Sequence, residues 1–91
     1  MSAPAFILRL KKRLKAELER AGIPAEIDSQ PVGGTKLHRL TVIAAKFAKL
    51  RFSERQALVW RIVDEEVPKE QLFISIILTL TPSEASGESA A

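Results

Sequence analysis

Basic side chains that can bind an anionic partner are concentrated in the middle of this chain. Seven lysines and arginines, but a single acidic residue, Glu54, lie between Lys36 and Arg61. Four of the seven lie in or next to residues 47–56: Lys46, Lys49, Arg51 and Arg55. Clustered cations attract the phosphates of nucleic acids or an acidic protein surface. The sequence therefore predicts a nucleic-acid-binding stretch built from these four side chains, with a merely solvated basic surface as the alternative.

Side chains for catalysis or metal binding are sparse by comparison. The chain has no cysteine and one histidine, His38, which excludes thiolate chemistry and any site made of several imidazoles. The carboxylates are scattered, and no base stands at a recognisable spacing from Ser53, whose position fits a helix cap better. Gly33 and Gly34 precede Lys36 without matching a phosphate-loop spacing. We therefore expect a protein that is not an enzyme and that binds no cofactor and no metal.

Length and composition indicate one small globular domain. The chain has 91 residues, of which 46% are hydrophobic, and a formal net charge of +3. A domain of this size buries a modest share of its surface, so a homodimer or a protein partner would add stability. No run of about 18 apolar residues reaches the length of a membrane span, and the charge order at the N-terminus is not that of a secretory signal. We predict a cytoplasmic domain over residues 1–82, without membrane contact, and a disordered tail over residues 83–91.

The first element that the pattern predicts is an amphipathic helix over residues 4–21. Its apolar side chains recur at spacings of three and four and share one face: Ile7, Leu10, Leu14, Leu18 and Ala21. Gly22 accepts the left-handed conformation that ends a helix, and Pro24 prevents continuation. The cationic face of this helix is expected to be solvated, with contact to an anionic surface as the alternative.

Two strands joined by a turn are expected next. Weak alternation predicts a strand over residues 25–29. Pro31 and the glycine pair predict a flexible turn over residues 30–36. The β-branched content of residues 37–45 then favours a second strand, covered on one face and partly on the other.

The helices after the second strand are defined by a capping signal. Hydrophobicity alone also allows one long helix over residues 41–66. Ser53, with Gln56 three residues on, has the spacing of a capping box, which marks a helix start. We therefore predict a turn or one-turn helix over residues 46–52 and a separate helix over residues 53–65.

That separate helix carries the only tryptophan of the chain, Trp60. We expect Trp60 to anchor the core, with a partner-facing position as the alternative. The acids at its end, Asp64, Glu65 and Glu66, are poorly placed for the helix dipole. The pattern of the sequence does not explain them.

The strongest strand candidate covers residues 72–80, an almost continuous apolar run. Such a strand is covered on both faces or pressed against a neighbouring subunit. Within it, Phe73 and Leu78 are predicted to contact a partner, with ordinary core packing as the alternative. The complete prediction is an α+β sandwich of αββααβ order. Its three-stranded mixed sheet has an antiparallel first pair, a right-handed helical crossover and helices on one face.

This order and several motifs resemble the BolA family, whose members share a class II KH-like topology. The family's central signature is a phenylalanine, a glycine two residues later, and Arg-His eight and nine residues later. Here Phe47 and Arg55 match, whereas Lys49 replaces the glycine and Gln56 the histidine. The motif after the last strand is also similar: Thr81-Pro82-Ser83-Glu84. The resemblance covers residues 6–84.

The resemblance implies two kinds of function. Some BolA-like proteins are DNA-binding transcriptional regulators, a role for which this chain would use its four clustered cations. Others share an iron–sulfur cluster with a monothiol glutaredoxin. The family's cluster-ligating histidine falls at Phe73, the loop over residues 30–36 lacks the second ligand, and His38 is one residue out of register. We therefore expect a non-enzymatic, nucleic-acid-binding regulator, with a glutaredoxin adaptor that supplies no cluster ligand as the alternative.

Overall fold

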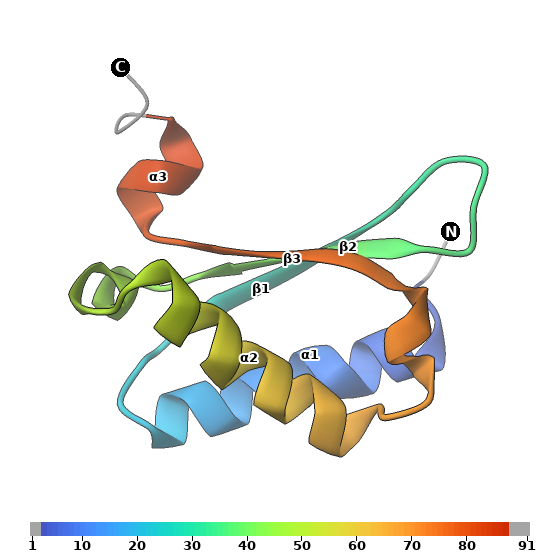
Figure 1. Cartoon of the computed structure of the whole chain (residues 1–91), viewed down its shortest axis with the longest axis horizontal. Helices are drawn as coiled ribbons and strands as arrows, with labels where there is room; N and C mark the ends of the chain where they lie inside the picture. The colour runs from blue at the N-terminus through green and yellow to red at the C-terminus, as the bar shows by residue number, and fades with distance from the viewer. Residues whose placement is uncertain (1–2, 88–91) are drawn as a thin grey trace.

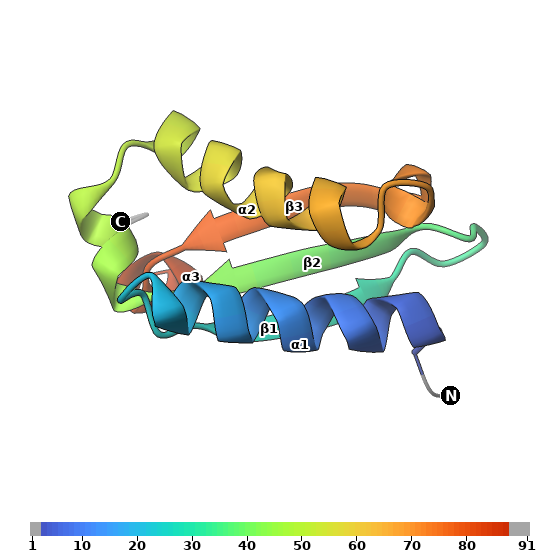
Figure 2. The same ribbon diagram turned by 90° about the horizontal axis from the view of Figure 1, so that it is seen from below.

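The computed structural model describes residues 3–87, which form a three-stranded sheet with two long helices on one face (Figures 1 and 2). In chain order the elements, with η for a 3-10 helix, are α1 (Ala5–Arg20), β1 (Glu26–Pro31), β2 (His38–Ile43), η1 (Ala45–Lys49), α2 (Phe52–Glu66), η2 (Glu70–Phe73), β3 (Ile74–Leu80) and α3 (Pro82–Ser86). The central strand β2 pairs antiparallel with β1 and parallel with β3. The predicted α+β fold and its mixed sheet are confirmed.

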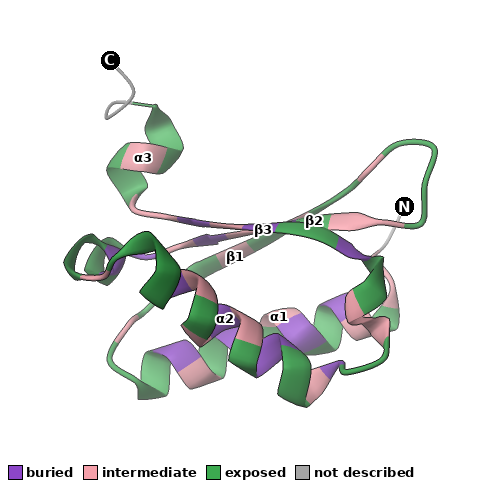
Figure 3. Ribbon diagram, in the orientation of Figure 1, coloured by how far each residue is buried: buried purple, intermediate pink, exposed green. Residues whose placement is uncertain are grey.

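The hydrophobic core lies between the sheet and the two long helices (Figure 3). α1 contributes four fully buried side chains at the predicted spacing: Ile7, Leu10, Leu14 and Leu18. Leu40 and Val42 from β2 and Phe47 from η1 complete the centre of this core. Ala21, which was also expected on the buried face, is exposed at the end of α1. None of the helices within residues 3–87 is long and apolar enough to cross a membrane.

The end of α1 follows from the glycine that the sequence singled out. Gly22 has a φ of 81°, which a residue without a Cβ adopts at no steric cost. Its N–H donates to Glu19 O at 3.0 Å, and the N–H of Ile23 donates to Leu18 O at 2.8 Å. These two bonds form a Schellman motif, which satisfies carbonyls at the helix end.

The hairpin between β1 and β2 is tighter than predicted. β1 continues through Pro31, which pairs with His38, so the prediction that Pro31 belongs to the turn is wrong. β1 is an edge strand, where a proline needs no ladder partner for its nitrogen. The turn itself is held at Thr35, whose hydroxyl donates to Val32 O at 2.8 Å.

The start of α2 lies two residues before the predicted cap. Arg51 is the N-cap residue, with φ −68° and ψ 157°, and Glu54 Oε1 accepts its backbone N–H at 2.8 Å. Ser53 is therefore a helical residue, and the prediction that it caps the helix with Gln56 is wrong. The break that the capping signal indicated between β2 and this helix is nevertheless present.

The last strand is shorter and more exposed than predicted. Leu72 and Phe73 belong to η2, so the strand begins at Ile74. Ile77 and Thr79 are buried towards the helices, whereas Ile76 is 47% exposed on the open face of the sheet. Within this chain, the predicted cover on both faces is thus absent from residues 74–80.

The chain after β3 is folded through Gly87. Pro82–Ser86 form α3, capped by Thr81, whose hydroxyl accepts the Glu84 N–H at 3.2 Å. A disordered tail was predicted from Ser83 onwards, and this is wrong for the residues of α3. Residues 88–91 of that predicted tail lie outside the described part of the chain.

The acids at the end of α2 are explained by a contact between helices. Arg13 of α1 donates to Glu66 Oε1 at 3.0 Å and lies 3.9 Å from a Glu65 carboxylate oxygen. Arg9 also pairs with Glu66, at 3.7 Å. Exposed ion pairs contribute about 0.2 to 1 kcal/mol each. Pairing across the two helices therefore offsets the unfavourable interaction of these acids with the helix dipole.

Candidate nucleic-acid interface

The predicted cations at positions 46, 49 and 51 gather where η1 leads into α2. A 3-10 helix has three residues per turn, so Lys46 and Lys49 lie on one face of η1, held in place by the fully buried Phe47. Arg51 follows as the N-cap of α2. All three cations are exposed, and none has a carboxylate within 4.0 Å among residues 3–87.

Beside these cations stands an aromatic side chain that the sequence did not single out as functional. Phe52, the first residue of α2, is 65% exposed. The sequence pattern does not show which way this phenylalanine is directed, and only its exposure in the fold shows that it is accessible. We name Lys46, Lys49, Arg51 and Phe52 the basic turn.

The first turn of α2 adds backbone donors to the basic turn. The N–H groups of Glu54 and Arg55 both donate to Arg51 O at 3.0 Å. Those of Phe52 and Ser53 have no acceptor among the described residues. Free N–H groups at the start of a helix carry partial positive charge and accept anions. The basic turn therefore combines exposed cationic side chains with fixed backbone donors.

Arg55, the fourth predicted cation, is directed inward and is only 9% exposed. Its Nε donates to Phe47 O at 2.9 Å, and its Nη1 donates to Thr79 O at 3.1 Å and to Glu84 Oε1 at 2.8 Å. The guanidinium thereby joins η1, β3 and α3. This internal position corrects the expectation of a phosphate contact, and we leave Arg55 out of the interface. The spacing of residues in α2 was a signal for this inward direction, because Arg55 lies on the same helical face as the buried Val59 and Ile62.

Glu84 completes this internal network. Its Oε1 accepts the Thr81 backbone N–H at 2.8 Å as well as the Arg55 bond. The Thr81 backbone hydrogen bond, followed by the Arg55 side-chain hydrogen bond, lowers the pKa of Glu84 below its usual value. Glu84 is therefore charged when it holds Arg55 and α3.

The edge of β3 is covered by the residue next to Arg55. Gln56 Nε2 donates to Ile77 O at 2.9 Å and to Thr79 Oγ1 at 3.1 Å, while its Oε1 accepts the Trp60 Nε1–H at 3.1 Å. Together with Arg55, it occupies two carbonyls of an edge strand that would otherwise invite another strand. Trp60 is half-buried against the core, in agreement with its expected anchoring role.

The two predicted partner contacts lie in different places. Phe73 is 40% exposed and packs against Phe6, with ring centroids 6.2 Å apart. Leu78 alternates with the buried Ile77 and Thr79, so it lies on the open face of the sheet. The structure therefore does not bring Phe73 and Leu78 into one site.

Phe73 instead borders a small apolar hollow of about 320 Å³. The other lining residues are Pro4, Phe6, Lys36 and His38. His38 contacts Phe6 edge-on, with ring centroids 6.1 Å apart. One imidazole, one ammonium group and two phenyl rings do not make an iron–sulfur ligand set. The hollow does not fit the cluster that BolA-like proteins are expected to share.

Comparison with known proteins supports the fold. No protein family model matches the chain, and no curated protein is similar to it in sequence. Among solved structures, BolA1 from Arabidopsis thaliana is similar at 21% identity and a TM-score of 0.64, over 90% of this chain and 98% of that one. The BolA domain of SufE1 from Arabidopsis thaliana is similar at 19% identity and a TM-score of 0.66, over 91% and 99%. The chain therefore has a BolA-like fold.

Proposed function

We propose that this chain is a non-enzymatic regulator that binds nucleic acid through the basic turn. One observation carries the proposal: three exposed cations, with no carboxylate of residues 3–87 within 4.0 Å, stand beside the first turn of α2. Phosphate oxygens accept hydrogen bonds from lysine, arginine and helix N–H groups alike. KH domains clamp a nucleic-acid backbone with a Gly-x-x-Gly loop. This chain has no such loop, and in our proposal Lys46, Lys49 and Arg51 take its place.

The composition of the basic turn favours single strands. Phosphate contacts position a nucleic acid without reading its sequence. Phe52 adds a ring on which an unpaired base stacks, whatever its identity. The proposed interaction is therefore weak, tolerant of sequence and strongly salt-dependent, with a dissociation constant of about 10⁻⁴ to 10⁻⁶ M.

The test is fluorescence anisotropy with labelled single-stranded and duplex oligonucleotides at low salt. We expect the triple variant Lys46→Ala/Lys49→Ala/Arg51→Ala to bind much more weakly at the same salt concentration. The matched control, Lys12→Ala/Arg61→Ala/Lys69→Ala, removes the same charge from other exposed positions. It should bind more tightly than the triple variant. Equal binding by both variants, or no binding by the unmodified chain, would contradict the proposal.

A second candidate function is supported by exposed apolar side chains around η2. Leu72 is 79% exposed and its neighbour Phe73 40% exposed, next to Phe6. Exposed aromatic and aliphatic side chains in one patch are typical of protein contacts. On this reading the chain is an adaptor that docks a monothiol glutaredoxin without supplying cluster ligands.

Titration calorimetry with a purified monothiol glutaredoxin tests the adaptor reading. We expect Leu72→Glu/Phe73→Glu to abolish heat of binding. Leu8→Glu, which changes a comparably exposed leucine (55%) elsewhere, should not. A visible cluster spectrum that forms on reconstitution only when this chain is present would contradict the absence of cluster ligands.

A further inference from the structure

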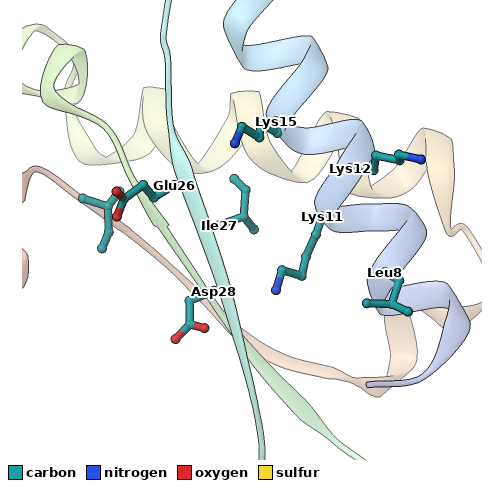
Figure 4. Close-up of a pocket in the computed structure, with 8 residues that line it drawn as sticks. Leu8, Lys11, Lys12, Lys15, Glu26, Ile27 and Asp28 are labelled. Atoms are coloured by element: carbon teal, nitrogen blue, oxygen red, sulfur yellow. The ribbon is translucent and has the colours of Figure 1, made fainter. Parts of the chain in front are cut away.

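A groove of about 800 Å³ runs between α1 and the edge strand β1. It is lined from α1 by Leu8, Lys11, Lys12 and Lys15, from β1 by Glu26, Ile27 and Asp28, and from β2 by Ile43 (Figure 4). Leu8 is 55% exposed although it belongs to the amphipathic helix. The groove therefore offers apolar surface with positive charge on its α1 side and two carboxylates on β1.

The floor of this groove is a strand edge with unpaired backbone. The N–H of Val32 donates to Leu37 O at 2.9 Å, and in an antiparallel pair every second residue bonds to the partner strand. From that register, Gln30, Asp28 and Glu26 bond to β2. Ile27 and Ser29 direct their N–H and C=O groups away from the sheet, and these groups have no backbone partner among the described residues.

The charges around the edge differ between its two sides. Figure 4 shows Lys11 and Lys15 extending from α1 towards β1, with Ile27 between them, whereas Glu26 and Asp28 lie on the other side of the strand. No carboxylate within residues 3–87 lies within 4.0 Å of either lysine ammonium. The side facing α1 is thus basic, and the side facing the open sheet is acidic.

We propose that the β1 edge binds an extended acidic peptide segment of a partner protein as a fourth strand. Backbone bonds to Ile27 and Ser29 would supply the pairing, as in other cases of strand addition. Side chains of a strand alternate between its faces. Acidic residues at every second position would meet Lys11 and Lys15, and neutral residues between them would avoid Glu26 and Asp28.

The same charges select against other occupants. A neutral apolar strand would bury the lysines without a counter-charge, which is one way that edge strands avoid aggregation. A nucleic acid offers phosphate acceptors to the lysines. It would leave the outward carbonyls of Ile27 and Ser29 unpaired and would place negative charge near Glu26 and Asp28. This inference is independent of nucleic-acid binding by the basic turn.

The test uses a fluorescent peptide of alternating glutamate and threonine and a second peptide of the same composition with its glutamates in one block. We expect the alternating peptide to bind the full chain more tightly in anisotropy titrations. Lys11→Glu/Lys15→Glu should weaken this binding by about tenfold or more. Lys69→Glu/Lys36→Glu, two reversals at exposed positions outside the groove, should leave it within about twofold. Equal binding of both peptides, or equal effects of both double variants, would overturn the proposal.

Backbone pairing is tested separately with peptides methylated at single amide nitrogens. Methylation should abolish binding at alternate positions and leave it intact at those between, because only every second N–H of an added strand meets β1. A uniform effect would indicate charge attraction alone and would overturn the fourth strand. A single-stranded oligonucleotide serves as the competitor. If it displaces the peptide and no longer binds Lys11→Glu/Lys15→Glu, the ligand of this edge is a nucleic acid and the proposal of a peptide is overturned.

Discussion

Replacing Arg55 by alanine tests whether this residue is internal or belongs to the nucleic-acid interface. The substitution leaves one buried main-chain acceptor, Thr79 O, without the donor that now lies 3.1 Å away, whereas Phe47 O keeps the Leu50 N–H at 3.0 Å. A buried acceptor left unpaired costs about 1 to 3 kcal/mol. The unpaired Thr79 O therefore predicts a loss of about 1 to 3 kcal/mol in the free energy of unfolding. Domains of this size are stabilised by about 5 to 13 kcal/mol in total.

The assay is urea unfolding followed by circular dichroism, with a thermal scan beside it. At about 4 to 8 °C per kcal/mol for a domain of this length, the melting temperature of Arg55→Ala should fall by roughly 4 to 24 °C. Arg61→Ala is the control, because Arg61 is exposed on the same helix and should change stability by less than about 0.5 kcal/mol. A loss below about 1 kcal/mol in Arg55→Ala would refute the internal role of this arginine.

The remaining predictions concern the site, the pH and a helix end. Phe52→Ala should weaken single-strand binding by about 1 to 3 kcal/mol and leave duplex binding almost unchanged, as measured by anisotropy; an equal loss for both would argue against stacking. Because the pKa of Glu84 is lowered in the folded state, its contribution to stability is present above the unfolded pKa of about 4.3. It is lost as the pH falls through the folded value. Urea unfolding of the unmodified chain and Glu84→Gln should therefore differ near neutral pH and converge in acid, whereas a pH-independent difference would contradict the role of the charge. Gly22→Ala should cost about 1 to 2 kcal/mol, because its φ of 81° is strained for any residue with a Cβ; an unchanged urea midpoint would show that the helix end can rearrange.

The fold was predictable because local patterns and tertiary structure agree. The spacing of Leu10, Leu14 and Leu18 fixed the buried face of α1 before any tertiary contact was known. Gly22 and Pro24 likewise indicated where that helix ends. Such agreement between local signals and the global fold is typical of well-folded sequences.

Element boundaries were less predictable because several residues offer similar local signals. Ser53 and Gln56 have the spacing of a capping box, but Arg51 and Glu54 have the same spacing two residues earlier. Glu54 does bond the Arg51 backbone N–H. In the same way, an apolar run does not indicate where a strand begins, so Leu72 and Phe73 were assigned to β3 instead of η2.

The candidate site was predictable in part. The positions of Lys46, Lys49 and Arg51 at an exposed turn agree with their sequence pattern. Arg55 was misassigned because its acceptor Thr79 is 24 residues away in the chain, and no local pattern reveals such a partner. The charge of a side chain predicts exposure on average, but a buried arginine with several acceptors is an exception that only the fold explains.

The most direct test of the central claim is the salt dependence of oligonucleotide binding. The logarithm of the affinity for single-stranded DNA falls with the logarithm of the salt concentration, with a slope of about −0.7 per phosphate contact. If Lys46, Lys49 and Arg51 each contact one phosphate, the triple alanine variant should have a slope shallower by about 2.1. The matched control, Lys12→Ala/Arg61→Ala/Lys69→Ala, should keep nearly the slope of the unmodified chain. Equal slopes for the triple variant and the unmodified chain would contradict phosphate binding by the basic turn.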